Sequence, residues 1–228
     1  MSQPHPTLNP FRNDSKRFQE VSPKLEFKFK QISIGVDPSY ANTGISIAAD
    51  NKLLKVSSVP LAKCKNNSQR RAILSNTLDA ILSKVVPKGQ EVVCIIERAR
   101  IHGGSTSFIN IDAIKGIGAL TATVVDRCAM YDVPVYSVDT RCWKSQVVGT
   151  SKGQTNCYGV PPEKWPTVLW ACKQGFKRSI CHPVQGRATK GTFLQDGVRY
   201  KFDNDAADSS AIATYWFVGD RNKLKEEH

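Results

Sequence analysis

The chain has 228 residues, of which 40% are hydrophobic and 23% are charged, with a formal net charge of +12 at pH 7. This length suits one good-sized core with appendages, and Lys and Arg spread along the whole chain favour a polyanionic partner over a merely solubilising surface. No apolar run approaches a membrane span, no signal-peptide pattern opens the chain, and seven irregularly spaced cysteines argue against a disulfide framework, so we expect an intracellular protein.

The first 30 residues hold four prolines among Asn, Asp, Ser and Lys. This composition predicts a disordered, mildly basic arm over 1–30. A mitochondrial presequence is the alternative, but the three acidic residues of the segment are unusual in one.

The globular part is expected to begin with a strand over 31–37, where apolar residues alternate with polar or small ones until Pro38. Two apolar runs follow, 45–49 and 53–59, separated by a glycine and an Asp-Asn turn, which predicts an antiparallel three-strand meander. Asp37 closes the first strand, where open sheets bind their ligands. The alternative is that Asp37 only shapes the turn.

Strands and helices alternate along the rest of the chain. Helical spacing over 73–85 predicts a helix, and the continuous apolar run 91–97 predicts a strand covered on both faces and ending in Glu97. The remaining predicted elements are a small-residue helix over 111–131, a strand over 133–138, a basic helix over 140–148, and helices over 165–173 and 205–218. The pattern predicts an α/β sandwich over 31–220, with an irregular insert at about 150–202 and a charged tail over 221–228.

Asp205 and Asp208 lie three residues apart in the first turn of the last predicted helix, so they project from one face. Acidic residues also suit a helix N-terminus, which leaves a structural role as the alternative. Alanines around the pair favour close packing, where two carboxylates repel unless a cation or proton intervenes. With Asp37 and Glu97 they make an all-oxygen set that suits Mg²⁺ or Mn²⁺, ions that can activate water and stabilise a leaving oxygen.

Five segments occur in the order found in RuvC-type Holliday junction resolvases, which the chain resembles over most of 32–217. They are IGVDPS at 34–39, IIER at 95–98, KGIG at 115–118, KSQVVG at 144–149 and DAADSSAIA at 205–213. The last two are the specific ones, because many RNase H-like proteins share the first strand. The resemblance implies an RNase H-like mixed sheet flanked by helices, a homodimer and metal-dependent cleavage of four-way DNA junctions.

Carried onto matching positions, Asp37, Glu97, Asp205 and Asp208 resemble the metal-binding carboxylates of that family. The resemblance implies two Mg²⁺ ions per active site, for which Mn²⁺ can substitute. Lys144 resembles a basic residue near the scissile phosphate and is grouped with the catalytic set.

The resemblance also implies a DNA-binding set around this site. The loop after Glu97 resembles the junction-probing loop of the family, with an apolar residue in place of its aromatic one. Lys152 resembles a second basic residue, although it lies nearer Gly149 than the family pattern has it. The expected DNA-binding residues are Arg98, Arg100, Ile101, Phe108, Arg141, Lys144 and Lys152.

The chain departs from the family in three places. The arm over 1–30 is extra, the segment 149–205 is longer than the usual spacer, and Ser39 stands where the family has Gly. The insert contains four residues that raise the alternative of a zinc site, although no two cysteines form a C-x-x-C pair: Cys157, Cys172, Cys181 and His182. Its basic residues suit contacts with phosphate, with a solvated hairpin as the alternative.

We therefore predict a homodimeric endonuclease of a bacterial or phage-infected cytoplasm that nicks opposing strands of a four-way junction, leaving 5′-phosphate and 3′-hydroxyl ends. Related nucleases that act on flaps, R-loops or RNA–DNA hybrids share the fold and stay open as alternatives. An actin-like ATPase or sugar kinase also begins with a strand ending in Asp, but needs a second half for which this chain is too short. A non-catalytic junction-binding protein would not need four acids.

Overall fold

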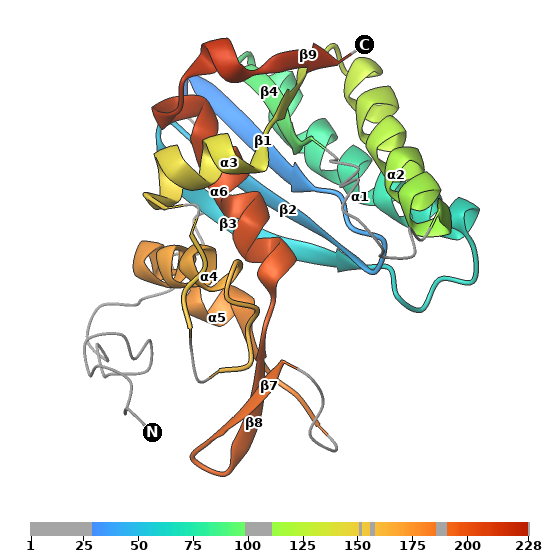
Figure 1. Ribbon diagram of the computed structural model, residues 1–228. Coiled ribbons are helices and arrows are strands. Elements are labelled where there is room, and N and C mark those ends of the chain that lie inside the picture. The colour runs from blue at the N-terminus through green and yellow to red at the C-terminus, as the bar shows by residue number, and fades with distance from the viewer. Residues whose placement is uncertain (1–28, 99–110, 151, 156–157, 186–190, 228) are drawn as a thin grey trace.

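The computed structural model describes residues 29–98, 111–150, 152–155, 158–185 and 191–227 (Figure 1). Its centre is a six-stranded sheet with the order β3-β2-β1-β4-β5-β9. The strands are β1 (Gln31–Asp37), β2 (Asn42–Ala49), β3 (Lys52–Pro60), β4 (Glu91–Glu97), β5 (Val135–Val138) and β9 (Lys225–Glu227). The first three form an antiparallel meander, β4 and β5 run parallel to β1, and β9 is antiparallel to β5. The predicted mixed sheet is confirmed.

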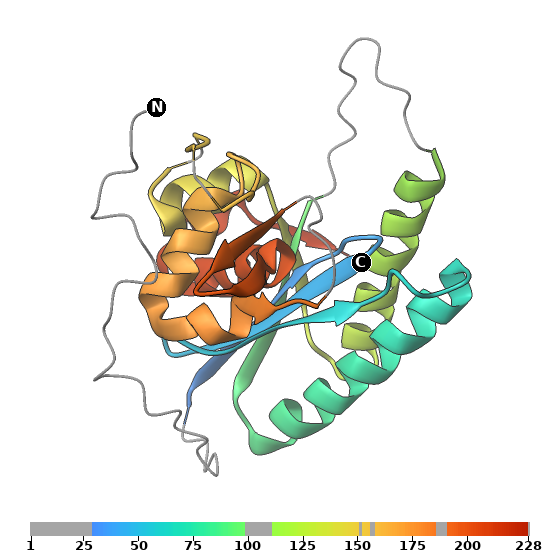
Figure 2. The same ribbon diagram turned by 90° about the horizontal axis from the view of Figure 1, so that it is seen from below.

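Helices cover both faces of this sheet (Figures 1 and 2). They are α1 (Asn67–Val85), α2 (Ile111–Ala129), α3 (Thr140–Trp143), α4 (Trp165–Ala171), α5 (Lys177–Ile180) and α6 (Asn204–Val218). Two short 3-10 helices, η2 (Val86–Lys88) and η5 (Arg221–Lys223), and two short π-helices, η3 (Lys144–Val148) and η4 (Cys172–Phe176), accompany them. Strand alternation divides the core between the two faces. Ile32, Ile34 and Val36 of β1 pack with α1 and α2, whereas Val93 and Ile95 of β4 pack with α6.

The insert forms a second, smaller sheet below the main one in Figure 1. Its strands β6 (Cys181–Pro183), β8 (Val198–Phe202) and β7 (Thr192–Gln195) pair antiparallel in that order. Phe193 of β7 and Phe202 of β8 stack on one face of this sheet, and the ring of Trp165 from α4 packs against Phe202. The sequence predicts only an irregular stretch or hairpin here, because strands of three to five residues carry too little periodicity to identify.

The C-terminal segment forms the edge strand of the six-stranded sheet. Residues 225–227, for which the sequence predicts only a charged tail, pair with β5 as the edge strand β9. The preceding Leu224 packs near Trp216 of α6, which anchors the segment. A strand of three charged residues shows no apolar alternation, so its pairing depends on this neighbouring contact.

Two glycines let α6 lie directly on the sheet. A Cβ atom on Gly35 of β1 would come within 2.3 Å of Ala213 N and Ser209 O, and one on Gly44 of β2 within 2.0 Å of Asp205 O. Neither position has room for a side chain, because the atoms opposite are backbone atoms of the helix. The spacing between α6 and the sheet therefore depends on the absence of side chains at these two positions.

We expect Gly35→Ala to lower the free energy of unfolding by about 3 kcal/mol or more, since overpacking against backbone forces the helix away from the sheet. Urea denaturation followed by circular dichroism measures the change. Gly118→Ala is the matched control, because nothing lies within 4 Å of a Cβ atom there in α2. That control should be neutral or stabilising by up to about 1 kcal/mol. Equal effects of the two substitutions would contradict this account of the packing.

Candidate active site

The strand register brings the acidic residues to one end of the sheet. Asp37 and Glu97 end the parallel neighbours β1 and β4, in which Val36 is aligned with Ile96. Asp37 is also aligned with Gly44 of β2, and Gly44 lies against the backbone of Asp205. The start of α6 therefore meets the carboxyl ends of both strands.

Burial and mutual repulsion shape the electrostatics of this acidic cluster, defined as Asp37, Glu97, Asp205 and Asp208. Burial, followed by the negative charge of Glu97, raises the pKa of Asp37 well above its ordinary value. Burial also raises the pKa of Glu97, where the charge of Asp208 adds to the shift. For Asp205, burial raises the pKa to about 6. These are the effects expected when carboxylates share a partly desolvated space.

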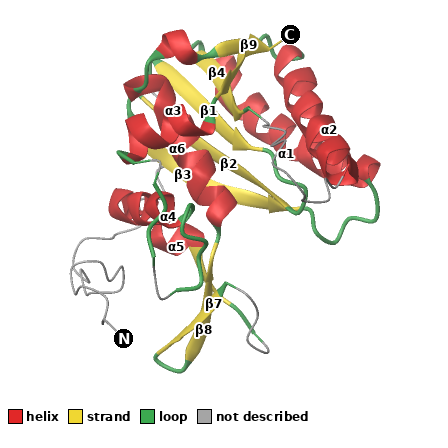
Figure 3. Ribbon diagram, viewed as in Figure 1, coloured by secondary structure: helices red, strands yellow, loops and turns green. Residues whose placement is uncertain are grey.

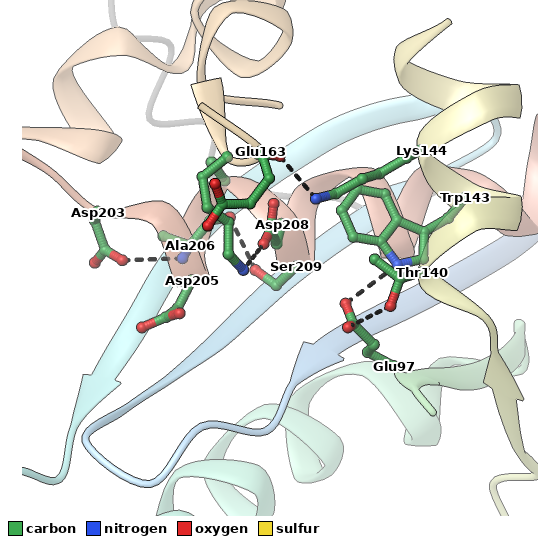
Figure 4. Close-up of polar contacts among 12 residues, drawn as sticks. Glu97, Thr140, Trp143, Lys144, Glu163, Asp203, Asp205, Ala206, Asp208 and Ser209 are labelled. Carbon is green, nitrogen blue, oxygen red and sulfur yellow. Dashed lines mark hydrogen bonds and ion pairs between the residues drawn. The ribbon is translucent and has the colours of Figure 1, made fainter. Parts of the chain in front are cut away.

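Hydrogen bonds fix the orientation of two of these carboxylates, and Figure 4 shows those of Glu97. Glu97 accepts from the Thr140 hydroxyl at 2.7 Å and from the Trp143 indole Nε1 at 3.2 Å, both from α3. Asp205 accepts from the Asn42 side chain at 3.2 Å. The same Asn42 amide donates to Asp203, which caps α6 by accepting from Ala206 N at 3.0 Å. Such partners hold a carboxylate in one position without removing its charge.

Lys164 supplies the positive charge inside the cluster. It immediately precedes α4 and forms an ion pair and hydrogen bond with Asp208, which is fully buried. The charges of Asp208 and Asp37 raise the pKa of Lys164 despite the opposing effect of burial. The sequence does not single out this residue, because it lies in the insert, outside any periodic segment. Its place directly before Trp165, at the start of a helix, is the signal available in the sequence.

Lys144 also lies at the site, but contacts the backbone of the insert. Its ammonium is buried and donates to Glu163 O at 2.9 Å. Its charge contributes to lowering the pKa of Glu97, against the larger effect of burial. Because Glu163 directly precedes Lys164, the Lys144 contact also helps to position the lysine that pairs with Asp208.

The other predicted site residues lie around this cluster or outside the described residues. Arg98 follows β4 and donates through Nε to Ser137 Oγ at 3.3 Å, while Arg141 and Lys152 are exposed. Arg100, Ile101 and Phe108 fall outside the described residues, as does Cys157 of the suggested zinc set. Lys152 forms no ion pair with a described residue.

The acidic cluster fits a hard divalent cation in its chemistry. All its donors are carboxylate oxygens, and Asp208 Oδ1 is buried without a hydrogen-bond partner. Burial is the main cause of the raised pKa values of Asp37 and Glu97, and the charges of neighbouring carboxylates add to both shifts. Within the described part of the chain, no three His, Cys, Asp or Glu side chains are placed closely enough to hold one ion.

The sheet order, the meander and the acidic end of the sheet define an RNase H-like α/β fold. The solved structures it matches include two of RuvC. A structure of T. thermophilus RuvC in complex with a Holliday junction substrate is 16% identical, with a TM-score of 0.56 over 86% of this chain and 99% of that one. Another Thermus thermophilus RuvC structure is 15% identical, with a TM-score of 0.51 and the same coverage. The predicted resemblance to RuvC-type resolvases is thus confirmed in the fold.

Other comparisons add no further relative. No protein-family model matches the sequence, and neither does any curated protein sequence. None of the helices in the described residues is long and apolar enough to cross a membrane.

The raised pKa of Asp205 predicts that its charge destabilises the metal-free fold. A carboxyl group whose pKa rises from 3.8 to about 6 on folding weakens the fold progressively between about pH 4 and pH 6. Asp205→Asn should therefore raise the free energy of unfolding by about 1–3 kcal/mol at pH 7.5 with a chelator present. Urea titrations at pH 7.5 and pH 4 measure this, and the difference should vanish at pH 4.

Asp126→Asn is the control for this prediction. Asp126 lies on α2 with 65% of its side chain exposed and contacts Arg71 only at 3.8 Å. Its substitution should change stability by less than about 0.5 kcal/mol at either pH. A parent protein more stable than Asp205→Asn at pH 7.5 would contradict the assigned cause.

Proposed function

We propose that this protein is a structure-selective DNA endonuclease that resolves four-way junctions by divalent-metal-dependent phosphodiester hydrolysis. The products are expected to carry 5′-phosphate and 3′-hydroxyl ends. The observation that carries the proposal is the convergence of four carboxylates and Lys164 at one end of an RNase H-like sheet. The net charge of +12 and the junction bound in the related RuvC structure support DNA as the substrate.

In this proposal, Asp37, Glu97, Asp205 and Asp208 would share two divalent cations, each held by some of the four carboxylates, with Mg²⁺ expected and Mn²⁺ able to replace it. The bound cations supply the Lewis-acid chemistry that phosphodiester hydrolysis needs. The residues of the chain prepare that site. Thr140 and Trp143 hold Glu97 in one orientation, and burial keeps Asp37 in a region of low water content where charge interactions are strong.

Lys164 has a distinct proposed role, which is to stabilise negative charge that develops on the phosphate. Its ammonium already lies against the buried carboxylate of Asp208 and close enough to Asp37 and Glu97 to respond to their charges. A fixed positive charge in a desolvated site stabilises a transition state more than one in water does. Lys144, through Glu163 O, supports the position of that charge.

We also propose that two copies of the chain act together. A four-way junction has two strands of equal geometry to cut, and a twofold homodimer offers one active site to each. The expected contact surfaces with the branch are the residues after Glu97 together with Arg98, Arg141 and Lys152. Arg141 and Lys152 are both exposed and positively charged, which suits contact with phosphates.

Asp208→Asn should abolish cleavage while leaving junction binding within about three-fold of the parent, since a carboxylate–cation interaction contributes to chemistry more than to affinity for DNA. The measurement uses end-labelled four-way junction, flap, R-loop, RNA–DNA hybrid and duplex, with Mg²⁺, Mn²⁺ or a chelator. Symmetric, ligatable nicks confined to the junction are the expected result. Asp126→Asn is the control and should cleave as the parent does. Metal-independent cleavage, or full activity of Asp208→Asn, would refute the proposal, and faster cutting of another substrate would reassign it.

Lys164→Met should reduce the cleavage rate at saturating protein by about 10²–10³-fold, the usual effect of removing one preorganised electrostatic group. Lys173→Met is the matched control, since Lys173 follows α4 on the same segment and is exposed. It should stay within about three-fold of the parent. Single-turnover assays on the four-way junction measure both variants. A Lys164→Met rate close to that of the control would leave Lys164 with only a structural role.

A further inference from the structure

The small sheet of the insert has two faces of opposite character. Register aligns Phe193 with Tyr200 and Cys181 with Phe202, and these side chains face the body of the protein, where Phe193 and Phe202 are buried. The alternate positions must face outward. They are His182, Thr192, Leu194, Arg199 and Lys201, aligned as His182–Lys201–Thr192 and Leu194–Arg199.

The strand residues of this outer face include two basic side chains and no acid. None of the three strands contains Asp or Glu, and neither Arg199 nor Lys201 forms an ion pair with a described residue. Leu194 is 65% exposed beside Arg199. A buried aromatic layer therefore lies behind a surface whose two outward basic residues form no ion pair with the described residues. Such a surface matches a polyanion in charge.

The same sheet is joined directly to the active site. The strand β8 ends at Phe202, the next residue is the capping Asp203, and Asp205 follows in α6. Asp203 N donates to Ile180 O at 2.6 Å, which ties this junction to the start of β6. Figures 1 and 3 show β7 and β8 projecting from the body at the N-terminal end of α6. The sheet is thus an extension of the catalytic helix.

We infer that this outer face binds the phosphate backbone of the DNA arm next to the cleaved bond. The inference rests on the proposed function and adds a substrate-binding surface to it. Arg199 and Lys201 contact the phosphates, and Leu194 packs against the sugars between them. At about 3.3 Å per residue, Lys201 and Arg199 lie at most roughly 13 and 20 Å along the chain from Asp205. At about 3.4 Å per base pair, those spans correspond to roughly four and six base pairs.

The test compares two double charge reversals. R199E/K201E changes the outer face. The control K223E/K225E makes the same change in charge at exposed positions in η5 and β9, on the opposite side of the molecule in Figure 1. Binding is measured on a four-way junction without divalent cation, across a range of salt concentrations. We expect R199E/K201E to raise the dissociation constant about ten-fold or more and to lower the salt slope by about two, and the control to change affinity by less than about three-fold.

A second measurement locates the contact. Uncharged methylphosphonates replace the phosphates about three to six nucleotides from the cleaved bond, the range set by the strand length. They should weaken binding by the parent and the control but not further weaken binding by R199Q/K201Q, a variant that avoids charge repulsion. Equal methylphosphonate effects in all three proteins, or equal losses in both charge reversals, would overturn the inference. Cleavage by R199Q/K201Q at saturating protein should stay within about three-fold of the parent rate.

The two proposals fail in different ways. A parent that neither binds nor cuts branched DNA refutes the proposed function. A parent that cuts junctions, with R199E/K201E indistinguishable from K223E/K225E in affinity, refutes only the surface assigned to the insert.

Discussion

The burial of neighbouring carboxylates, together with the repulsion between them, is the constraint on which the rest of this structure depends. The pKa of Asp37, Glu97 and Asp205 is raised in each case, first by burial and then by neighbouring acids in the cases of Asp37 and Glu97. Folding must therefore hold together groups that would separate in water. The ion pair between Lys164 and Asp208 offsets part of this repulsion, and it does so from a segment remote in sequence from the strands. The insert is thereby part of the candidate active site.

The packing of α6 is what makes this concentration of charge possible. With glycine at positions 35 and 44, the helix backbone meets the sheet directly, so Asp205 and Asp208 start beside the ends of β1 and β4. The buried hydroxyl groups of Ser46 and Ser209 form a hydrogen bond of 2.7 Å in the same interface. This bond gives each hydroxyl group a partner where close packing excludes water. A side chain at either glycine would move the carboxylates of α6 away from those of the strands. Close helix–sheet contact and the acidic cluster are therefore one structural feature.

The fold and the acids could be predicted from the sequence because both follow from simple periodicities. Asp37 and Glu97 end apolar runs, and parallel strands place their carboxyl ends at one edge of a sheet. Lys164 could not be found in this way, since its role arises from the packing of α4 against α6. The small sheet of the insert could not be predicted from the sequence for a related reason. Its strands have buried aromatic residues on one face only, over too few residues for the alternation to stand out from a loop.

The insert connects these observations, because one continuous segment carries both Lys164, which pairs with the acidic cluster, and the basic residues of the small sheet. Its first helix brings Lys164 to Asp208, and its last strand leads through Asp203 into α6. The hydrogen bond from Asn42 to both Asp203 and Asp205 links that last strand to β2 as well. A ligand bound to the outer face of the small sheet would thus be connected to the N-terminal end of α6 by a short stretch of chain, which consists of β8 and the Asp203 cap. In a protein that cuts DNA, binding an arm there would stabilise the ground state and the transition state equally, so this face would contribute to affinity for the substrate and not to the rate of the chemical step.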